Sequence, residues 1–203
     1  MRDGGADADV TREFDLTTKR FVEGGFFRPE AKGGLGWIDE NRVYVFTDFG
    51  AGSMTSSGYP RVVKEWTRGT PLESAKVVYE GTDRDMYIAA MRDDTPGFER
   101  DFVSRTLAFY NNELYLRADD GTLTRIDAPN SAEKGLHKQW LSLELREPWT
   151  VGGKTYAAGS LLVLLGALGK LVRGRAGGQL AGVHVNMAER LSLVRKSTVL
   201  VTC

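Results

Sequence analysis

Few side chains in this sequence have the types and spacing that hydrolytic chemistry needs. A serine nucleophile is often held in a G-x-S-x-G turn between a strand and a helix. Ser53 follows Gly52 and Ser160 follows Gly159, but alanine stands two positions before each serine. Residues 50–53 also lack the third glycine and the lysine of a phosphate-binding loop. We therefore interpret residues 50–53 as a flexible loop and assign no catalytic residue.

Histidine and acidic side chains offer no better candidates. His137 lies just before an alternating apolar run at 141–145, where a hydrogen-bonded or solvated structural role is expected. His184 lies in a segment of different composition, and we expect the same of it. Four acids within nine residues could bind Ca²⁺, but their spacing matches no EF-hand loop, so we expect a solvated loop between strands. These acids are Asp93, Asp94, Glu99 and Asp101.

The tryptophans could line a ligand surface or pack between sheets. Most of them fall on predicted strands, where packing of one sheet against the next is the favoured interpretation. They are Trp37, Trp66, Trp140 and Trp149. No cofactor-binding or metal-binding residue is assigned, and no cofactor is expected.

Composition restricts the partners and the compartment. The 203 residues carry 27 basic and 27 acidic side chains, so the net charge is zero and neither nucleic acid nor an acidic membrane is indicated as a partner. The single cysteine, Cys203, excludes an intrachain disulfide, and the polar N-terminus is not a signal peptide. The most apolar run, 157–169, is shorter than the roughly 20 residues of a membrane span. We expect a cytoplasmic protein without a membrane segment.

Short strands separated by turns dominate the rest of the pattern. Residues 43–46 form a wholly apolar run, and residues 141–145 alternate apolar and polar positions. Asp119-Asp120-Gly121 separates ELYLR from TLTRI, which is a strong hairpin signal. Helical patterns are scarce before residue 157, so we predict an all-β chain.

Three hairpin-like segments repeat along the chain at about 12–22, 62–80 and 113–127. Each opens with a glutamate, and these residues, Glu13, Glu65 and Glu113, are about 50 residues apart. A repeat of this length made of short strands is typical of β-propeller blades, each a four-stranded antiparallel sheet. One blade is predicted from strands at about 34–38, 42–48, 61–67 and 75–80. The next is predicted at about 85–91, 102–109, 113–117 and 123–127. The alternative is a β-sandwich with similar hairpins.

A long stretch of sequence supports the propeller. The segments REFDLTTKRFVEGGFF, GWIDENRVYVFTDFGAGSMTSSGYPRVVKEWTRGTPL, TPGFERDF, ELYLR and PWTVGGKTYAAGSLL closely resemble the β-propeller domain of the prolyl oligopeptidase family of serine peptidases. The resemblance covers about residues 3–165, and TDFGAGSMTSSGYPR is its most specific part. It implies a partial propeller with two whole blades and parts of two more.

The resemblance also implies a function. In the family, the propeller admits only short proline-containing peptides to an α/β-hydrolase domain that holds the Ser, His and Asp of the active site. This sequence contains only propeller-like segments, so we expect a fragment that has no peptidase activity alone. Its expected partners are the missing hydrolase domain, peptide substrates of the intact protein, and other copies through exposed blade faces. A stand-alone binding module and a truncated, nonfunctional product are the alternatives.

The last part of the sequence differs from the family pattern. Residues 157–203 contain no aromatic residue and carry six basic side chains against one acid. We therefore divide the chain into a partial propeller at 1–165 and a divergent, possibly non-native tail at 166–203, irregular or partly helical. Asn186 and Glu189 have the chemistry of a helix start, and a short helix is expected at 187–196.

Overall fold

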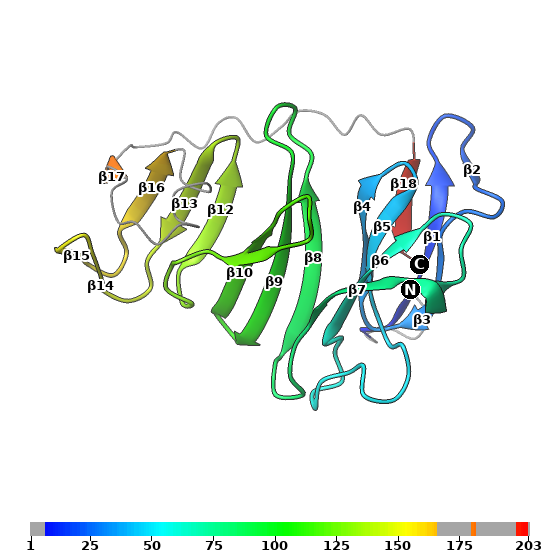
Figure 1. The fold of residues 1–203 in the computed structure, drawn as a ribbon, viewed down its shortest axis with the longest axis horizontal. Helices are drawn as coiled ribbons and strands as arrows, with labels where there is room; N and C mark the ends of the chain where they lie inside the picture. The colour runs from blue at the N-terminus through cyan, green and yellow to red at the C-terminus, as the bar shows by residue number, and fades with distance from the viewer. Residues whose placement is uncertain (1–6, 166–179, 182–197, 203) are drawn as a thin grey trace. The chain divides into compact units, whose positions relative to one another are not determined.

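The computed structural model describes residues 7–165, 180–181 and 198–202, and its regular structure is almost entirely β-strand (Figure 1). Among these residues the one helix is a single 3₁₀ turn, η1 (Leu72–Ser74). The prediction of an all-β chain is therefore confirmed. No helix in the described part of the chain is long and apolar enough to cross a bilayer. The chain forms two compact units, one ending at Arg92 and joined by the last strand, the other beginning at Asp93.

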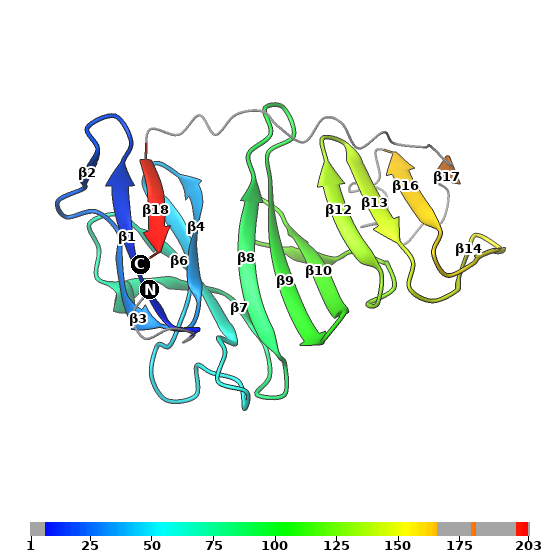
Figure 2. The ribbon, with the colours of Figure 1, turned by 180° about the vertical axis from the view of Figure 1, so that it is seen from behind.

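The first sheet combines both ends of the described chain. Its strands are β1 (Asp9–Asp15), β2 (Arg20–Phe21), β3 (Phe27–Ala31) and β18 (Thr198–Thr202). β18 pairs antiparallel with β1 over five residues, from Thr11↔Thr202 to Asp15↔Thr198. The two strands lie side by side in front and rear views, β18 in red and β1 in blue (Figures 1 and 2). β2 and β3 share the other edge of β1.

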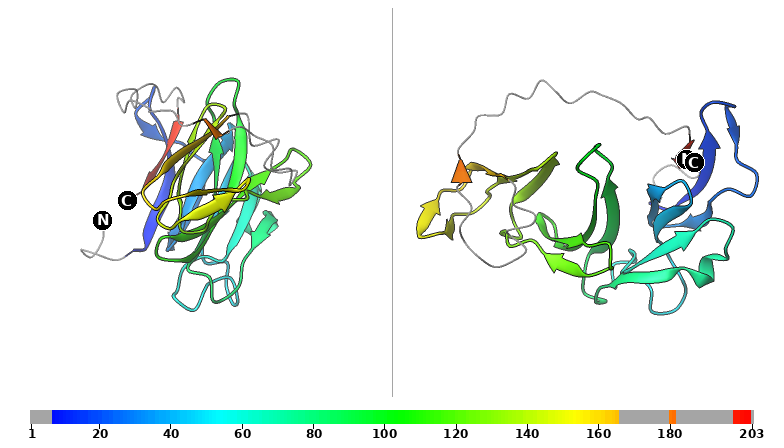
Figure 3. Two further views of the ribbon diagram at one scale, coloured as in Figure 1. Left: turned by 90° about the vertical axis from the view of Figure 1, so that its left-hand side faces the viewer. Right: turned by 45° about the horizontal axis from the view of Figure 1, so that its top comes forward.

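The second sheet is an antiparallel meander within the first unit. Its strands are β4 (Gly34–Asp39), β5 (Arg42–Phe46), β6 (Val62–Thr67) and β7 (Lys76–Glu80), in that spatial order. These bounds agree with the predicted blade to within two residues. The apolar run of β5 is buried throughout, as expected of an inner strand covered on both faces. The long β5–β6 connection, in light blue, extends beyond the end of its sheet (Figure 3).

Two further four-stranded sheets follow along the chain. The third contains β8 (Tyr87–Asp93), β9 (Arg100–Ala108), β10 (Asn111–Arg117) and β11 (Leu123–Arg125) in sequence order. The fourth contains β12 (Glu133–His137), β13 (Trp140–Glu144), β16 (Leu161–Leu165) and β17 (Leu180–Ala181). A separate hairpin, β14 (Trp149–Val151) with β15 (Lys154–Tyr156), is inserted between β13 and β16.

The blade assignment is confirmed by these sheets. The hairpins predicted at 12–22, 62–80 and 113–127 belong to three different sheets. Two sheets are continuous in sequence, and the other two each include a strand from beyond residue 165. That arrangement matches the expected two whole blades and parts of two more. The expected turn at Asp119–Gly121 is present, with Gly121 at φ 84° and its N–H donated to the Ala118 carbonyl.

Each unit has its own apolar core between sheets. In the first unit, Phe26, just before β3, packs edge-to-face on Trp37 and Trp66 of the second sheet. In the second unit, side chains of the third sheet such as Phe102 and Leu114 pack with Leu141 and Leu143 of the fourth. Burial of these side chains at about 25 cal/mol per Å² of apolar surface is the main force holding sheet to sheet.

The segment 166–203 is described only at β17 and β18. Both are paired strands, β17 with β16 and β18 with β1. The helix expected at 187–196 lies outside the described residues. The suggestion that this segment is foreign to the family stays a prediction.

Candidate functional site

The serine that most resembled a nucleophile is part of the β5–β6 loop. Ser53 is buried, and its hydroxyl donates to the Gly50 carbonyl at 2.7 Å while accepting the Phe49 N–H at 2.8 Å. Gly50 and Gly52 have φ of 101° and 81°, which a glycine-rich turn permits. The hydroxyl therefore holds the loop closed. Residues 50–53 form a loop, as expected, and its flexibility stays a prediction. Ser160 lies in the turn that leads into β16, with its N–H donated to the Ala157 carbonyl.

His137 and the acidic group at 93–101 form no metal-binding group among the described residues. His137 is exposed at the end of β12, and His184 lies outside the described residues. Asp93 accepts from Arg100 at 2.6 Å and from the Thr95 hydroxyl at 2.6 Å. Burial raises the pKa of Asp93, but the bonds from Thr95 and Arg100 outweigh it and hold the pKa below its usual value. In the described ranges no group of three or more His, Cys, Asp or Glu side chains could hold a metal ion.

Each of the three glutamates that open the repeated hairpins forms an ion pair with an arginine. Glu65 pairs with Arg42 at 3.0 Å, and Glu113 lies 3.3 Å from Arg105. Glu13 differs because it is buried, at 2% exposure. Its two carboxylate oxygens accept hydrogen bonds from the two terminal nitrogens of Arg68, with N···O distances of 2.8 and 2.9 Å.

The Glu13–Arg68 pair joins the first and second sheets of the first unit. Glu13 belongs to β1, and Arg68 follows β6. Glu13 also accepts the Phe26 N–H at 3.0 Å, and the Arg68 guanidinium lies 4.7 Å from the centre of the Phe26 ring. Arg68 further donates to the Glu40 carbonyl at 2.8 Å. A forked arginine–carboxylate pair of this kind fixes orientation as well as contributing energy.

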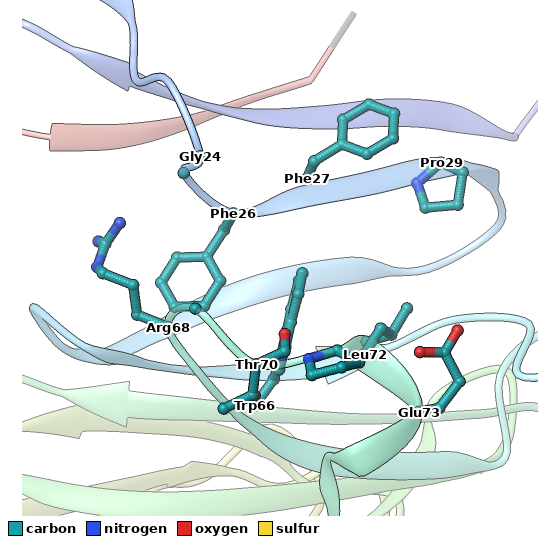
Figure 4. A pocket seen from close by; sticks show the side chains of 12 residues that line it. Gly24, Phe26, Phe27, Pro29, Trp66, Arg68, Thr70, Leu72 and Glu73 are labelled. Atoms are coloured by element: carbon teal, nitrogen blue, oxygen red, sulfur yellow. The ribbon is translucent and has the colours of Figure 1, made fainter.

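A pocket of about 420 Å³ lies beside this ion pair. Residues 24–27 and Pro29 line one side, and Trp66 with residues 68–73 lines the other. Figure 4 shows Phe27 and Pro29 on β3, opposite Leu72 and Glu73. The Trp66 indole N–H donates to the Thr70 carbonyl at 2.8 Å, so the loop after β6 is held against its own strand. The pocket falls within the size range of sites for small molecules and short peptide segments.

Sequence reasoning placed Trp37 and Trp66 in packing between sheets, and their contacts with Phe26 agree. It missed that Trp66 also lines a pocket. The available signal was the aromatic-and-glycine cluster GGFF at 24–27, followed later by the turn RGTP at 68–71. Nothing in the linear sequence indicates that these two segments lie opposite each other.

A second, half-buried cation, Lys134, lies in the second unit. The Lys134 ammonium lies within 3.4 Å of five oxygens contributed by Asn112, Pro129, Asn130 and Ala132. Burial lowers the pKa of Lys134 to about 8. This cage joins the start of β12 to the start of β10. It could not be predicted from side-chain types, because four of its five oxygens are backbone carbonyls.

A third cation is wholly enclosed in the first sheet. The Arg28 side chain on β3 has no exposed surface. It pairs with Asp9, and it donates to the Thr11 hydroxyl at 2.9 Å and to the Ala31 carbonyl at 2.7 Å. This network fixes the pairing of β3 with β1.

Comparison with known proteins identifies the fold. No family model matches the chain. An uncharacterized peptidase of Sinorhizobium fredii is 36% identical over 156 residues, which cover 74% of this chain and 22% of that protein. An uncharacterized peptidase of Rickettsia prowazekii is 28% identical over 178 residues, covering 81% and 25% respectively.

A solved structure agrees with these relatives. The structure of a post-proline cleaving enzyme from Rickettsia typhi superposes with a TM-score of 0.77 and 28% identity, covering 88% of this chain and 28% of that one. The chain thus spans about a quarter of the length of the proteins it matches. By sequence and by fold, the chain matches a fragment of prolyl oligopeptidase-like peptidases, and its sheets correspond to part of their β-propeller domain.

Proposed function

We propose that the chain is the propeller section of a prolyl oligopeptidase-like serine endopeptidase and that it acts by steric selection. In this role the blades cover a hydrolase active site and admit short proline-containing peptides. The supporting observation is the match to the post-proline cleaving enzyme over 88% of the chain, together with separate four-stranded antiparallel sheets. A closed set of such sheets forms a rigid wall, which suits a filter.

The described side chains support a division of labour in which this chain selects and another domain cuts. The Ser53 hydroxyl makes hydrogen bonds with Phe49 and Gly50 of its own loop and has no histidine partner among the described residues. A nucleophile needs a base within hydrogen-bond reach. The chemistry is therefore assigned to a hydrolase domain in the same or another chain.

The experiment that tests this division uses the purified 203-residue chain with a Gly-Pro chromogenic substrate. We expect no turnover above buffer. Turnover that copurifies with the chain, and that a serine-directed phosphonate abolishes, would contradict the proposal.

A stand-alone binding module is the second candidate. It is favoured by two observations inside the first unit: β18 completes the first sheet, and the pocket beside Arg68 is built entirely within that unit. A monodisperse chain with one cooperative unfolding transition would favour this candidate over a truncated, nonfunctional product. Aggregation without a transition would favour the latter.

A further inference from the structure

We propose that the pocket between β3 and the loop after β6 binds a peptide segment that carries an apolar ring next to a lysine or arginine. The ring would lie against Phe26 and Trp66, and the cation would pair with Glu73. The proposal does not depend on the peptidase-related role of the chain, because every lining residue lies within the first unit.

The floor and walls of the pocket suit an apolar ring. Phe26 and Trp66 are 2% and 8% exposed and form an edge-to-face pair 5.1 Å apart at their ring centres. Phe27, half exposed, and Leu72 lie toward opposite sides of the opening (Figure 4). Pro29 adds a rigid apolar surface. Aromatic-lined grooves accept proline-rich peptide segments, whose extended conformation is preformed and loses little entropy on binding.

The charge of the pocket selects a cation. Two charged side chains line it, Arg68 and Glu73. Both terminal nitrogens of Arg68 are engaged by the buried carboxylate of Glu13, so its charge is already balanced. Glu73 is exposed in η1 and has no hydrogen bond or ion pair within the described ranges. The Glu73 carboxylate is therefore the charged group of the pocket that can pair with a ligand, and a basic ligand group complements it.

The uncharged polar side chains of the walls, Trp66 and Thr70, already have hydrogen-bond partners. The Trp66 indole N–H donates to the Thr70 carbonyl, and the Thr70 hydroxyl donates to the Thr67 carbonyl at 2.7 Å. Selection therefore rests on ring contact and on Glu73. The mouth is open at two glycines, because a Cβ built on Gly24 or Gly69 would meet no heavy atom within 4 Å. This open space leaves room for the backbone that carries a bound ring, which favours a peptide segment.

The test is a matched pair of probes, Ac-Phe-Lys-NH₂ and Ac-Phe-Glu-NH₂, titrated into the full chain. Binding is followed by the NMR signal of the Trp66 indole N–H, assigned with Trp66→Phe. We expect the lysine probe to shift this signal and to bind about threefold more tightly than the glutamate probe, as for a partly exposed ion pair.

Three variants make the outcome decisive. Glu73→Gln should abolish the preference, Glu73→Lys should reverse it, and Phe27→Ala should weaken both probes. Glu144→Gln, at an exposed position on β13 in the other unit, is the matched control and should change nothing. The proposal is overturned if neither probe shifts the Trp66 signal, if both bind equally, or if the lysine preference survives in Glu73→Lys.

Discussion

Replacing Lys134 with methionine should destabilise the second unit more than any exposed lysine change. The Lys134 ammonium lies 3.0–3.1 Å from four oxygens and 3.4 Å from a fifth. An ammonium has three protons, so three of these contacts can be direct hydrogen bonds. Methionine preserves most of the apolar stem but leaves the oxygens without their donor. Each buried acceptor left unsatisfied costs about 1–3 kcal/mol, and partial access to water reduces the sum, so we expect a loss of about 3 kcal/mol.

The measurement is urea unfolding of the full chain at pH 7, where Lys134 is mostly charged because its pKa lies at about 8. Lys154→Met is the control. Lys154 is exposed, and its ammonium lies 4.9 Å from the centre of the Tyr156 ring, a contact worth less than about 1 kcal/mol. Lys134→Ala removes the whole side chain and leaves space in the cage. Added ammonium ions should enter this space, donate to the oxygens and restore part of the lost stability. Choline, whose quaternary nitrogen has no N–H to donate, should not. Equal effects of Lys134→Met and Lys154→Met would refute the reasoning.

Two further substitutions test the blades. Gly33→Ala should cost about 2–4 kcal/mol, because Gly33 has φ 137° and an added Cβ would lie 2.0 Å from the Phe46 carbonyl oxygen. Gly58→Ala, at φ 76° in open space, should cost only about 1 kcal/mol by the same thermal melt, and equal costs would show that the Phe46 contact is absent. Asp93→Asn should cost about 1–2 kcal/mol at pH 7. The pKa of Asp93 is lowered in the folded protein, so the stability that its carboxylate contributes is present above the unfolded pKa and is lost as the pH falls through the folded pKa. The free energies of unfolding of the two proteins should therefore converge in an acid titration. A difference in stability that stays constant with pH would rule out a charge effect.

Much of the blade structure is readable from local sequence. The four strands of the second sheet were predicted to within two residues because an apolar run, β-branched residues and turn glycines mark each boundary. The hairpin at β10 and β11 was predicted because Gly121 supplies the positive φ that its turn requires. In both cases the signal and the structure lie within a few residues of each other.

The candidate pocket could not be predicted in the same way. It requires Phe26 and Trp66, 40 positions apart, to meet between two sheets, and alternation along a strand does not specify which sheets are neighbours. The buried Glu13–Arg68 pair has the same character, because Glu13 was recognised only as the start of a repeat. Such long-range pairs depend on how the sheets pack.

The pairing of β18 with β1 was missed for a different reason. The run TVLVT at 198–202 is rich in β-branched residues and is a fair strand signal by itself. The lack of aromatic residues in 166–203 argues against a propeller strand there and hides this signal. Composition describes a segment as a whole and conceals a short strand inside it.

The central claim, that these blades select substrates by size, is tested most directly by a chimera. Residues 9–165 replace the matching section of the post-proline cleaving enzyme of Rickettsia typhi, and labelling by a serine-directed phosphonate confirms that the active site is intact. The measurement is the ratio of kcat/KM for a short proline-containing peptide to that for a folded, proline-containing protein. We predict that the chimera cleaves the short peptide and rejects the folded protein. A correctly labelled chimera that cleaves both equally well would contradict the claim.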